Sequence, residues 1–168
     1  MSDAADLKPG DKPPTTGRVF LVIIDDSPEL KVALRYACRR AAKTGGRIAM
    51  AYVMEPGDYQ EWVGVSNLIR DEARQQAEAI MQKMAGEVQK LSGNFPILFF
   101  REGDRQEEVM KLIDEEPSIS ILVLGASTGP KGPGPLISAL TGKSIAKLRI
   151  PITIVPGNLT DADIENIA

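Results

Sequence analysis

The chain has no histidine and only one cysteine, Cys38. Histidine is the commonest general base in enzymes and the commonest metal ligand, so its absence excludes Ser–His and Cys–His catalysis. A single cysteine cannot form a disulfide within the chain, which is typical of proteins kept in a reducing compartment. We therefore expect a cytoplasmic protein, and we expect Cys38 to pack as a small apolar residue on the buried side of a helix.

Aromatic residues make up only 5% of the chain, and no apolar run approaches the roughly 20 residues that span a bilayer. Net charge is −3, whereas nucleic-acid binding usually needs a basic face. We therefore expect neither a membrane nor a nucleic-acid partner. Residues 1–17 are polar, carry no signal-peptide core, and are predicted to be a disordered leader. Trp62, the one tryptophan, lies in a segment (55–66) that either packs on the sheet edge or forms a flap or partner contact.

Five short apolar runs alternate with segments of helical periodicity. The strands are predicted at 18–24, 47–54, 95–101, 119–124 and 152–155, with helices in the four intervals between them. Apolar, uninterrupted strands are typical of a parallel sheet covered on both faces. The prediction is an α/β fold, a single Rossmann-like domain (18–157) in which four helices and a five-stranded parallel sheet form three layers. The acidic tail, 158–168, either adds a turn of helix or stays loose.

Local signals set the expected helix boundaries. Ser27 is a good N-cap with Pro28 at the first helical position, and Gly45 and Gly46 end that helix. Asp104 and Glu107 have the spacing of a capping box. In parallel sheets, ligands bind beyond the carboxyl ends of the strands. The candidate ligand segments are therefore 25–27, 53–55 and the glycine-rich loop 125–142.

Two common phosphate-binding patterns fail in this chain. Gly142-Lys143-Ser144 matches the second half of a P-loop, but the first glycine of that motif would fall at Ile137. The dinucleotide pattern G-x-G-x-x-G should follow the first strand, where the chain reads DDSPEL. Neither motif therefore explains the glycine-rich loop.

The residues that remain resemble the universal stress protein family over about 18–155. VFLVIIDDSPELKVALRYACRRA is similar to the first strand and helix of that family, AYVMEP to its second strand, and PITIVP to its last strand. The resemblance implies an adenine nucleotide (ATP, ADP or AMP), held in the nucleotide-binding branch by a loop of the form G-x2-G-x9-G-[S/T]. It also implies a homodimer that pairs through the last strand, Ile152–Val155.

Two registers place this motif. Anchored on the fourth strand, its positions fall on Gly125, Thr128 and Ser138, with Ala139 in place of the final hydroxyl residue, and no gap is needed up to Pro151. Anchored on glycine spacing, they fall on Gly129, Gly132 and Gly142 with Lys143 next, which leaves a shorter final helix. The first register is favoured because strand ends and crossover length are costly to move.

The resemblance carries over to a set of binding residues at the sheet edge. Asp25 and Val53 are expected on the base or ribose side and Leu124 with Gly125 along the base and sugar, while Thr128 and Ser138 approach the phosphates. The full candidate set is Asp25, Ser27, Val53, Leu124, Gly125, Ser127, Thr128, Gly129, Gly132 and Ser138. Because Asp25 and Asp26 would repel phosphate, Mg2+ is expected to accompany a nucleotide.

Three functions stay open at this point. The first is a stress-response regulator that binds an adenine nucleotide and signals through an unknown protein partner. The second is a dimeric interaction module without nucleotide, because Pro130, Pro133 and Pro135 remove three N–H donors from the loop. The third is a weak nucleotide hydrolase. The sequence assembles no nucleophile with a base, so we do not expect an enzyme beyond slow nucleotide turnover.

Overall fold

The computed structural model describes residues 17–58 and 66–168. Its single sheet has five parallel strands in the order β3-β2-β1-β4-β5. The strands are β1 (Val19–Ile23), β2 (Arg47–Met54), β3 (Ile97–Glu102), β4 (Ile119–Ala126) and β5 (Ile152–Pro156). All five predicted strands are confirmed. Residues 1–16 of the leader and 59–65, which include Trp62, lie outside the described residues.

The described residues form five α-helices, one more than the sequence predicted. They are α1 (Glu29–Thr44), α2 (Ser66–Ser92), α3 (Arg105–Glu115), α4 (Pro135–Thr141) and α5 (Asp161–Ile167), with short 3-10 turns η1 (Pro56–Asp58) and η2 (Lys143–Lys147). The additional helix lies in the acidic tail. The crossover from β4 to β5 is α4 followed by η2.

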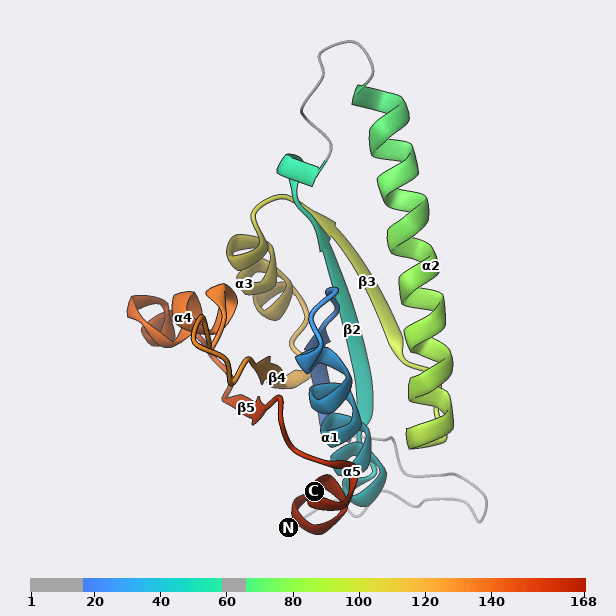
Figure 1. Cartoon of the computed structure of the whole chain (residues 1–168), viewed down its shortest axis with the longest axis vertical. Coiled ribbons are helices and arrows are strands. Elements are labelled where there is room, and N and C mark those ends of the chain that lie inside the picture. Colours follow the sequence, from blue (N-terminus) through green and yellow to red (C-terminus); the bar gives the residue numbers. More distant parts are fainter. Residues whose placement is uncertain (1–16, 59–65) are drawn as a thin grey trace, which may run out of the picture.

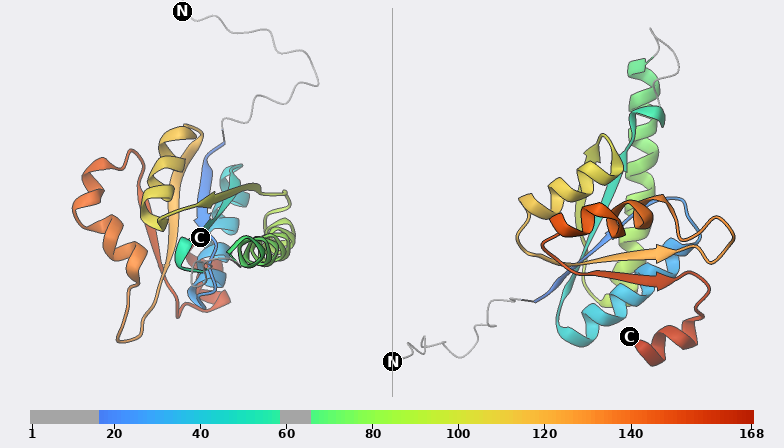
Figure 2. Two further views of the ribbon diagram at one scale, coloured as in Figure 1. Left: turned by 90° about the horizontal axis from the view of Figure 1, so that it is seen from above. Right: turned by 90° about the vertical axis from the view of Figure 1, so that its left-hand side faces the viewer.

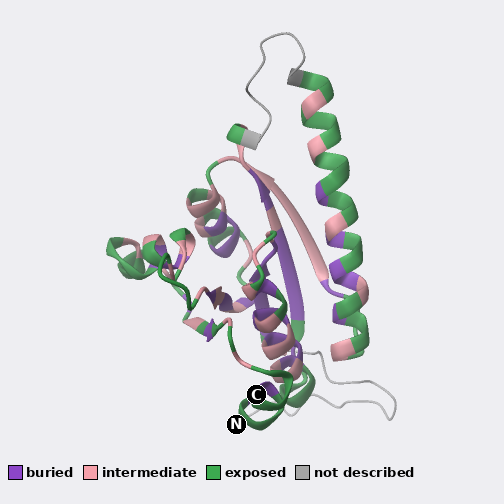
Figure 3. Cartoon of the chain, in the orientation of Figure 1, coloured by how far each residue is buried: buried purple, intermediate pink, exposed green. Residues whose placement is uncertain are grey.

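Two helical layers cover the sheet (Figures 1 and 2). Alternate residues of β1 point to opposite faces: Phe20 and Val22 join the core under α1 and α2, while Leu21 and Ile23 join the core under α3 and α4. Figure 3 shows buried residues along the strands and exposed ones on the outer sides of the helices. Because both faces are covered, the central strand β1 is apolar at every position, which is why it could be predicted from the sequence.

Two of the predicted helix ends are confirmed. Gly45 takes a left-handed conformation (φ 69°), and the N–H of Gly46 donates to the Ala41 carbonyl over 2.9 Å. Asp104 caps α3, its carboxylate accepting from the Glu107 amide over 3.0 Å.

The prediction that Ser27 caps α1 was wrong. The Ser27 hydroxyl donates to Asp25 Oδ1 over 2.6 Å, and α1 starts at Glu29 with no side-chain cap. The ionised carboxylate of Asp25 is a stronger hydrogen-bond partner for the Ser27 hydroxyl than the neutral amides of the first helical turn are. The pair holds the chain that leaves β1.

The acidic tail docks on α1 as helix α5. Thr160 and Asp163 form a reciprocal capping box at its start. The hydrogen bond from the Thr160 amide lowers the pKa of the Asp163 carboxyl most, and the hydrogen bond with the Thr160 side chain lowers it further. Ile164 is buried in the core shared with α1. Burial of an isoleucine stabilises a helix this short far more than its exposed ion pairs do.

Candidate functional site

A cavity of about 300 Å³ opens at the carboxyl ends of β1 and β4. The chain leaves β1 for a helix on one face of the sheet, whereas the helix before β4 lies on the other face. Strand order therefore reverses between these two strands, which is where open α/β sheets bind their ligands.

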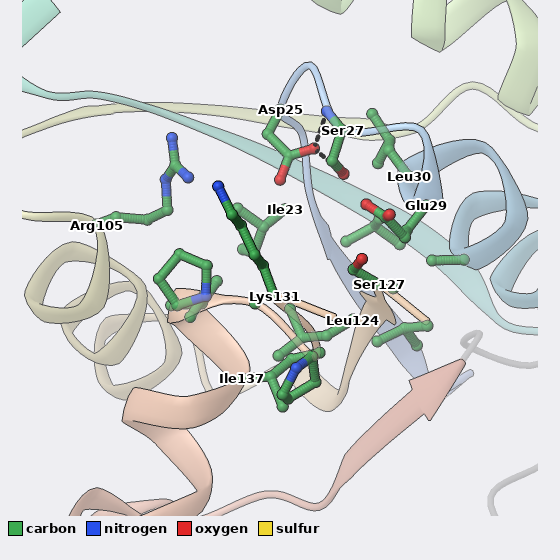
Figure 4. Close-up of a pocket in the computed structure, with 18 residues that line it drawn as sticks. Ile23, Asp25, Ser27, Glu29, Leu30, Arg105, Leu124, Ser127, Lys131 and Ile137 are labelled. Carbon is green, nitrogen blue, oxygen red and sulfur yellow. Dashed lines mark hydrogen bonds between the residues drawn. The ribbon is translucent and has the colours of Figure 1, made fainter. Parts of the chain in front are cut away.

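The floor of the cavity is apolar and its rim is charged (Figure 4). Ile23, Leu30, Leu124 and Ile137 supply the apolar surface. The rim carries two carboxylates, two cations and two hydroxyls: Asp25, Glu29, Arg105, Lys131, Ser27 and Ser127. An apolar floor with few convergent polar groups is typical of a small-molecule site.

Asp25 is held with one carboxylate oxygen bound and the other available. Its Oδ1 accepts from the Ser27 amide over 2.9 Å and from the Ser27 hydroxyl over 2.6 Å. Within the described part of the chain, Oδ2 receives no hydrogen bond. The turn after β1 therefore presents an oriented acceptor at the cavity rim, suited to a ribose or other hydroxyl donor.

The first turn of α1 forms one wall because two glycines let it approach the sheet. A Cβ at Gly125 would lie 2.6 Å from the Glu29 carbonyl oxygen, and a Cβ at Gly157 would lie 2.4 Å from Glu29 Cγ. Real side chains do not fit at such distances. Gly125 is thus required for α1 to start against the end of β4, with Leu30 facing the cavity.

The loop between β4 and α4 is folded back on itself. The Ser127 amide donates to the Pro133 carbonyl, and the Gly132 amide to the Gly129 carbonyl, both over 3.0 Å. A Cβ on Gly132 would lie 2.0 Å from the Ser127 carbonyl oxygen, so only glycine fits there. These contacts use loop amides internally, and no hydrogen bond from the amides of Thr128 and Lys131 is seen within the described residues.

Cationic side chains partly replace the amides that the loop has used. Lys131 reaches from the loop toward Asp25, with Arg105 of α3 beside it (Figure 4). Glu55 orients Arg105, because its Oε1 accepts from the Arg105 amide over 3.3 Å and lies 3.9 Å from Nε. Two positive charges in a partly enclosed cavity favour an anionic ligand group.

Half of the ten candidate residues line the cavity. They are Asp25, Ser27, Leu124, Gly125 and Ser127. The others lie elsewhere: Val53 is buried in β2, Thr128, Gly129 and Gly132 belong to the folded loop, and Ser138 is exposed on α4. Ser138 is not among the lining residues, whereas its neighbour Ile137 on α4 is.

Three charged lining residues were not among the candidates. Glu29 and Arg105 each lie in the first turn of a helix that follows the carboxyl edge of the sheet. That position was a usable signal, because such first turns face the ligand crevice. Lys131 was noted only as the single positive charge of the loop.

Cys38 does not offer a nucleophile. Its side chain is fully buried in α1, and burial raises the pKa of the thiol to about 12, although the neighbouring Arg39 opposes this. The described residues contain no cluster of three potential metal ligands. Among residues 17–58 and 66–168, no helix combines the length and hydropathy of a membrane-spanning segment.

The sequence profile of the Universal stress protein family matches residues 17–156. The chain belongs to this family. Solved structures of the family share its fold: UspA from Lactobacillus plantarum superposes with a TM-score of 0.68 at 16% identity, over 82% of this chain and 97% of that one. No curated protein matches the chain.

Two similar structures of universal stress proteins contain adenine nucleotides. One is a complex with cAMP, with a TM-score of 0.57, 16% identity, and coverage of 84% of this chain and 98% of that one. The other, from Archaeoglobus fulgidus, is a complex with dAMP, with a TM-score of 0.54, 14% identity, and coverage of 82% and 97%. At these identities the likeness shows the shared fold.

Proposed function

We propose that this universal stress protein is a regulator that binds an adenine nucleotide in the cavity between β1 and β4. The observation that carries the proposal is the cavity itself, with its apolar floor, its oriented Asp25 carboxylate, and Lys131 and Arg105 on the rim. The cAMP and dAMP complexes of similar structures support the ligand class. The base would lie on Ile23 and Leu124, and the phosphate would face the two cations.

The size and charge of the cavity favour few phosphates over many. About 300 Å³ is at the lower end of the range for ligand pockets. The rim cations Lys131 and Arg105 are matched by the carboxylates Asp25 and Glu29. One phosphate can be paired with both cations, whereas a triphosphate would bring added negative charge near the carboxylates and would need Mg2+ to offset it.

A thermal unfolding series tests this proposal. The midpoint is measured with AMP, ADP or ATP at millimolar concentration, each with and without Mg2+. A ligand at about 100 times its dissociation constant stabilises by roughly 2.7 kcal/mol, which raises the midpoint of a domain this size by about 5–10 °C. We expect the largest rise with AMP and a Mg2+-dependent rise with ATP. No rise with any nucleotide would contradict the proposal.

The regulatory step would be a population shift. A phosphate that binds Lys131 would fix the loop 125–142 in one arrangement and so change a surface that a protein partner contacts. We infer that a partner protein in the cytoplasm binds the surface formed by this loop, and that the chain acts without catalysing a reaction. A weak nucleotide hydrolase stays a third candidate, and phosphate release during the same incubations would reveal it.

The nucleotide-free interaction module is the second candidate, and one observation favours it. The loop already satisfies the Ser127 and Gly132 amides internally, and Pro130, Pro133 and Pro135 have no N–H to offer. A loop that is rigid without ligand suits a fixed recognition surface. The unfolding series separates the two candidates.

We further propose a homodimer formed through β5. This strand is at one edge of the sheet and pairs only with β4 among the described strands. Ile154, in its middle, is 42% exposed, and an unpaired apolar edge favours pairing with a second copy. Pro156, the last residue of β5, limits the length of that pairing.

Sedimentation at roughly 10 µM, a concentration at which a micromolar complex is mostly formed, is expected to give a dimer. Ile154→Asp is expected to give a monomer because it places a charge in the pairing edge. Ile145→Asp, on η2 and 48% exposed, is the matched control and leaves the dimer intact. A wild-type monomer, or equal effects of both substitutions, would remove the proposal.

A further inference from the structure

A second cavity lies on the opposite face of the sheet, in the groove between α1 and α2. Its volume is about 370 Å³, at least that of the nucleotide cavity. Val32 and Leu34 of α1 and Met84 and Leu91 of α2 supply its apolar surface. The end nearest the tail is closed by Asp161 of α5.

The rim of this groove carries three cations, Lys31, Arg35 and Lys83, against Glu87 and Asp161. Arg35 is paired with α5, its Nε 3.4 Å from Asp161 Oδ1. Lys31 and Lys83 are exposed and form no ion pair with any described carboxylate. The groove therefore combines apolar surface with two positive charges that remain available to an incoming group.

Helix α5 shows which chemistry this side of α1 accepts. It buries Ile164 and sets carboxylates on α1 cations: Glu165 Oε1 lies 2.6 Å from Arg39 Nε, and Asp161 faces Arg35. The contact thus combines an aliphatic side chain with carboxylates three positions before it and one after it. The family match ends at Pro156, so α5 lies beyond the residues that the family profile covers.

We propose that the α1–α2 groove docks an acidic amphipathic helix of a partner protein. Aliphatic side chains of that helix would enter between Val32 and Met84, as Ile164 enters beside α1. Its carboxylates would pair with Lys31 and Lys83. This is helix-in-groove recognition, with apolar anchors at steps of three and four residues and charge complementarity setting the orientation. The docking does not require nucleotide in the other cavity.

The probe is a fluorescent peptide of about 14 residues, long enough for some helix, with leucines three and four residues apart and glutamates between them. Its binding to the full chain is followed by anisotropy at about 50 mM salt, where charge pairs are weakly screened. A matched peptide carries glutamine in place of every glutamate. We expect the glutamine peptide to bind at least about tenfold more weakly, because it loses the ion pairs.

The double variant Lys31→Glu with Lys83→Glu is expected to lose about tenfold or more in affinity for the acidic peptide. Lys143→Glu with Lys147→Glu, both exposed on η2, makes the same charge change elsewhere and is expected to bind normally. Equal binding by the glutamine peptide, an unchanged Lys31/Lys83 variant, or an equal loss in the η2 variant would each overturn the proposal. All variants are first shown to keep the wild-type unfolding midpoint.

Amide NMR shifts locate the bound peptide. Shift changes confined to α1 and α2 around Lys31 and Lys83 support docking in the groove. Release of α5 would show that the peptide displaces α5 from α1 instead of binding in the groove, and it would overturn the proposal. The experiment is repeated on a chain that starts at Gly17. Tighter binding by at least about tenfold would identify residues 1–16 of this chain as the occupant and overturn a partner helix.

Discussion

Gly125→Ala is expected to lower the free energy of unfolding by about 2–3 kcal/mol, through overpacking. The added Cβ would lie 2.6 Å from the Glu29 carbonyl oxygen and 2.8 Å from Glu29 Cβ. The nearest atoms are backbone at the start of α1, so the helix has to move away from β4. Because Leu30 and Glu29 line the cavity, nucleotide affinity is expected to fall with stability. Urea unfolding and AMP titration measure the two effects.

Gly86→Ala is the matched control for this substitution. Gly86 lies inside α2, and a Cβ there would meet nothing within 4 Å. Alanine favours helix over glycine by about 1 kcal/mol, so this variant is expected to become more stable and to bind nucleotide normally. If Gly125→Ala unfolded at the wild-type urea concentration, the close packing of α1 on the end of β4 would be contradicted.

The strands could be predicted because each carries its own signal. A central parallel strand is buried on both faces, so β1 is apolar at every position and the run ends where the strand ends. Gly45 and Asp104 were predictable for the same reason, since a left-handed residue and an N-cap each need particular residue types. Helix α5 was left open because seven residues carry too short a pattern to separate a docked turn from a loose tail.

The site was harder to predict because it depends on contacts between distant segments. The Ser27 hydroxyl can either accept from an amide in the first turn of α1 or donate to Asp25, and the local sequence does not decide between these two hydrogen bonds. Ser138 fitted a motif position but lies on the exposed side of α4, since the loop before it folds on itself through Gly132. Arg105 lines the cavity from the first turn of α3, where Glu55, the residue after β2, contacts it from a distant part of the chain.

The preference for the register on Gly125, Thr128 and Ser138 over the register on the three spaced glycines also depends on the crossover. The spacing-based register leaves only a short helix after Gly142 to return the chain to the sheet. In the structure α4 already makes most of the crossover before Gly142, and η2 only completes it. Because a helical segment lies on each side of Gly142, the length of the helix after Gly142 is no argument against the spacing-based register.

Lys131→Ala is expected to weaken AMP binding by about 10- to 100-fold. Loss of one charge-assisted hydrogen bond to phosphate costs about 1.5–3 kcal/mol, and each 1.4 kcal/mol is tenfold in affinity. Lys131 lines the cavity from an exposed loop position, so its removal leaves the core unchanged. Calorimetric titration measures the loss, and adding Arg105→Ala is expected to increase it further because both cations face the same anion.

Two comparisons make this result specific to phosphate. Adenosine, which has no phosphate, is expected to bind the wild type and Lys131→Ala equally, because the apolar floor and Asp25 are unaltered. Lys143→Ala removes an exposed lysine that does not line the cavity and is expected to bind AMP normally. An equal loss for adenosine and AMP would show that Lys131 shapes the loop instead of pairing with phosphate. Full AMP affinity in Lys131→Ala would place the phosphate elsewhere, and the cavity would then have to bind its ligand through the Asp25 side alone.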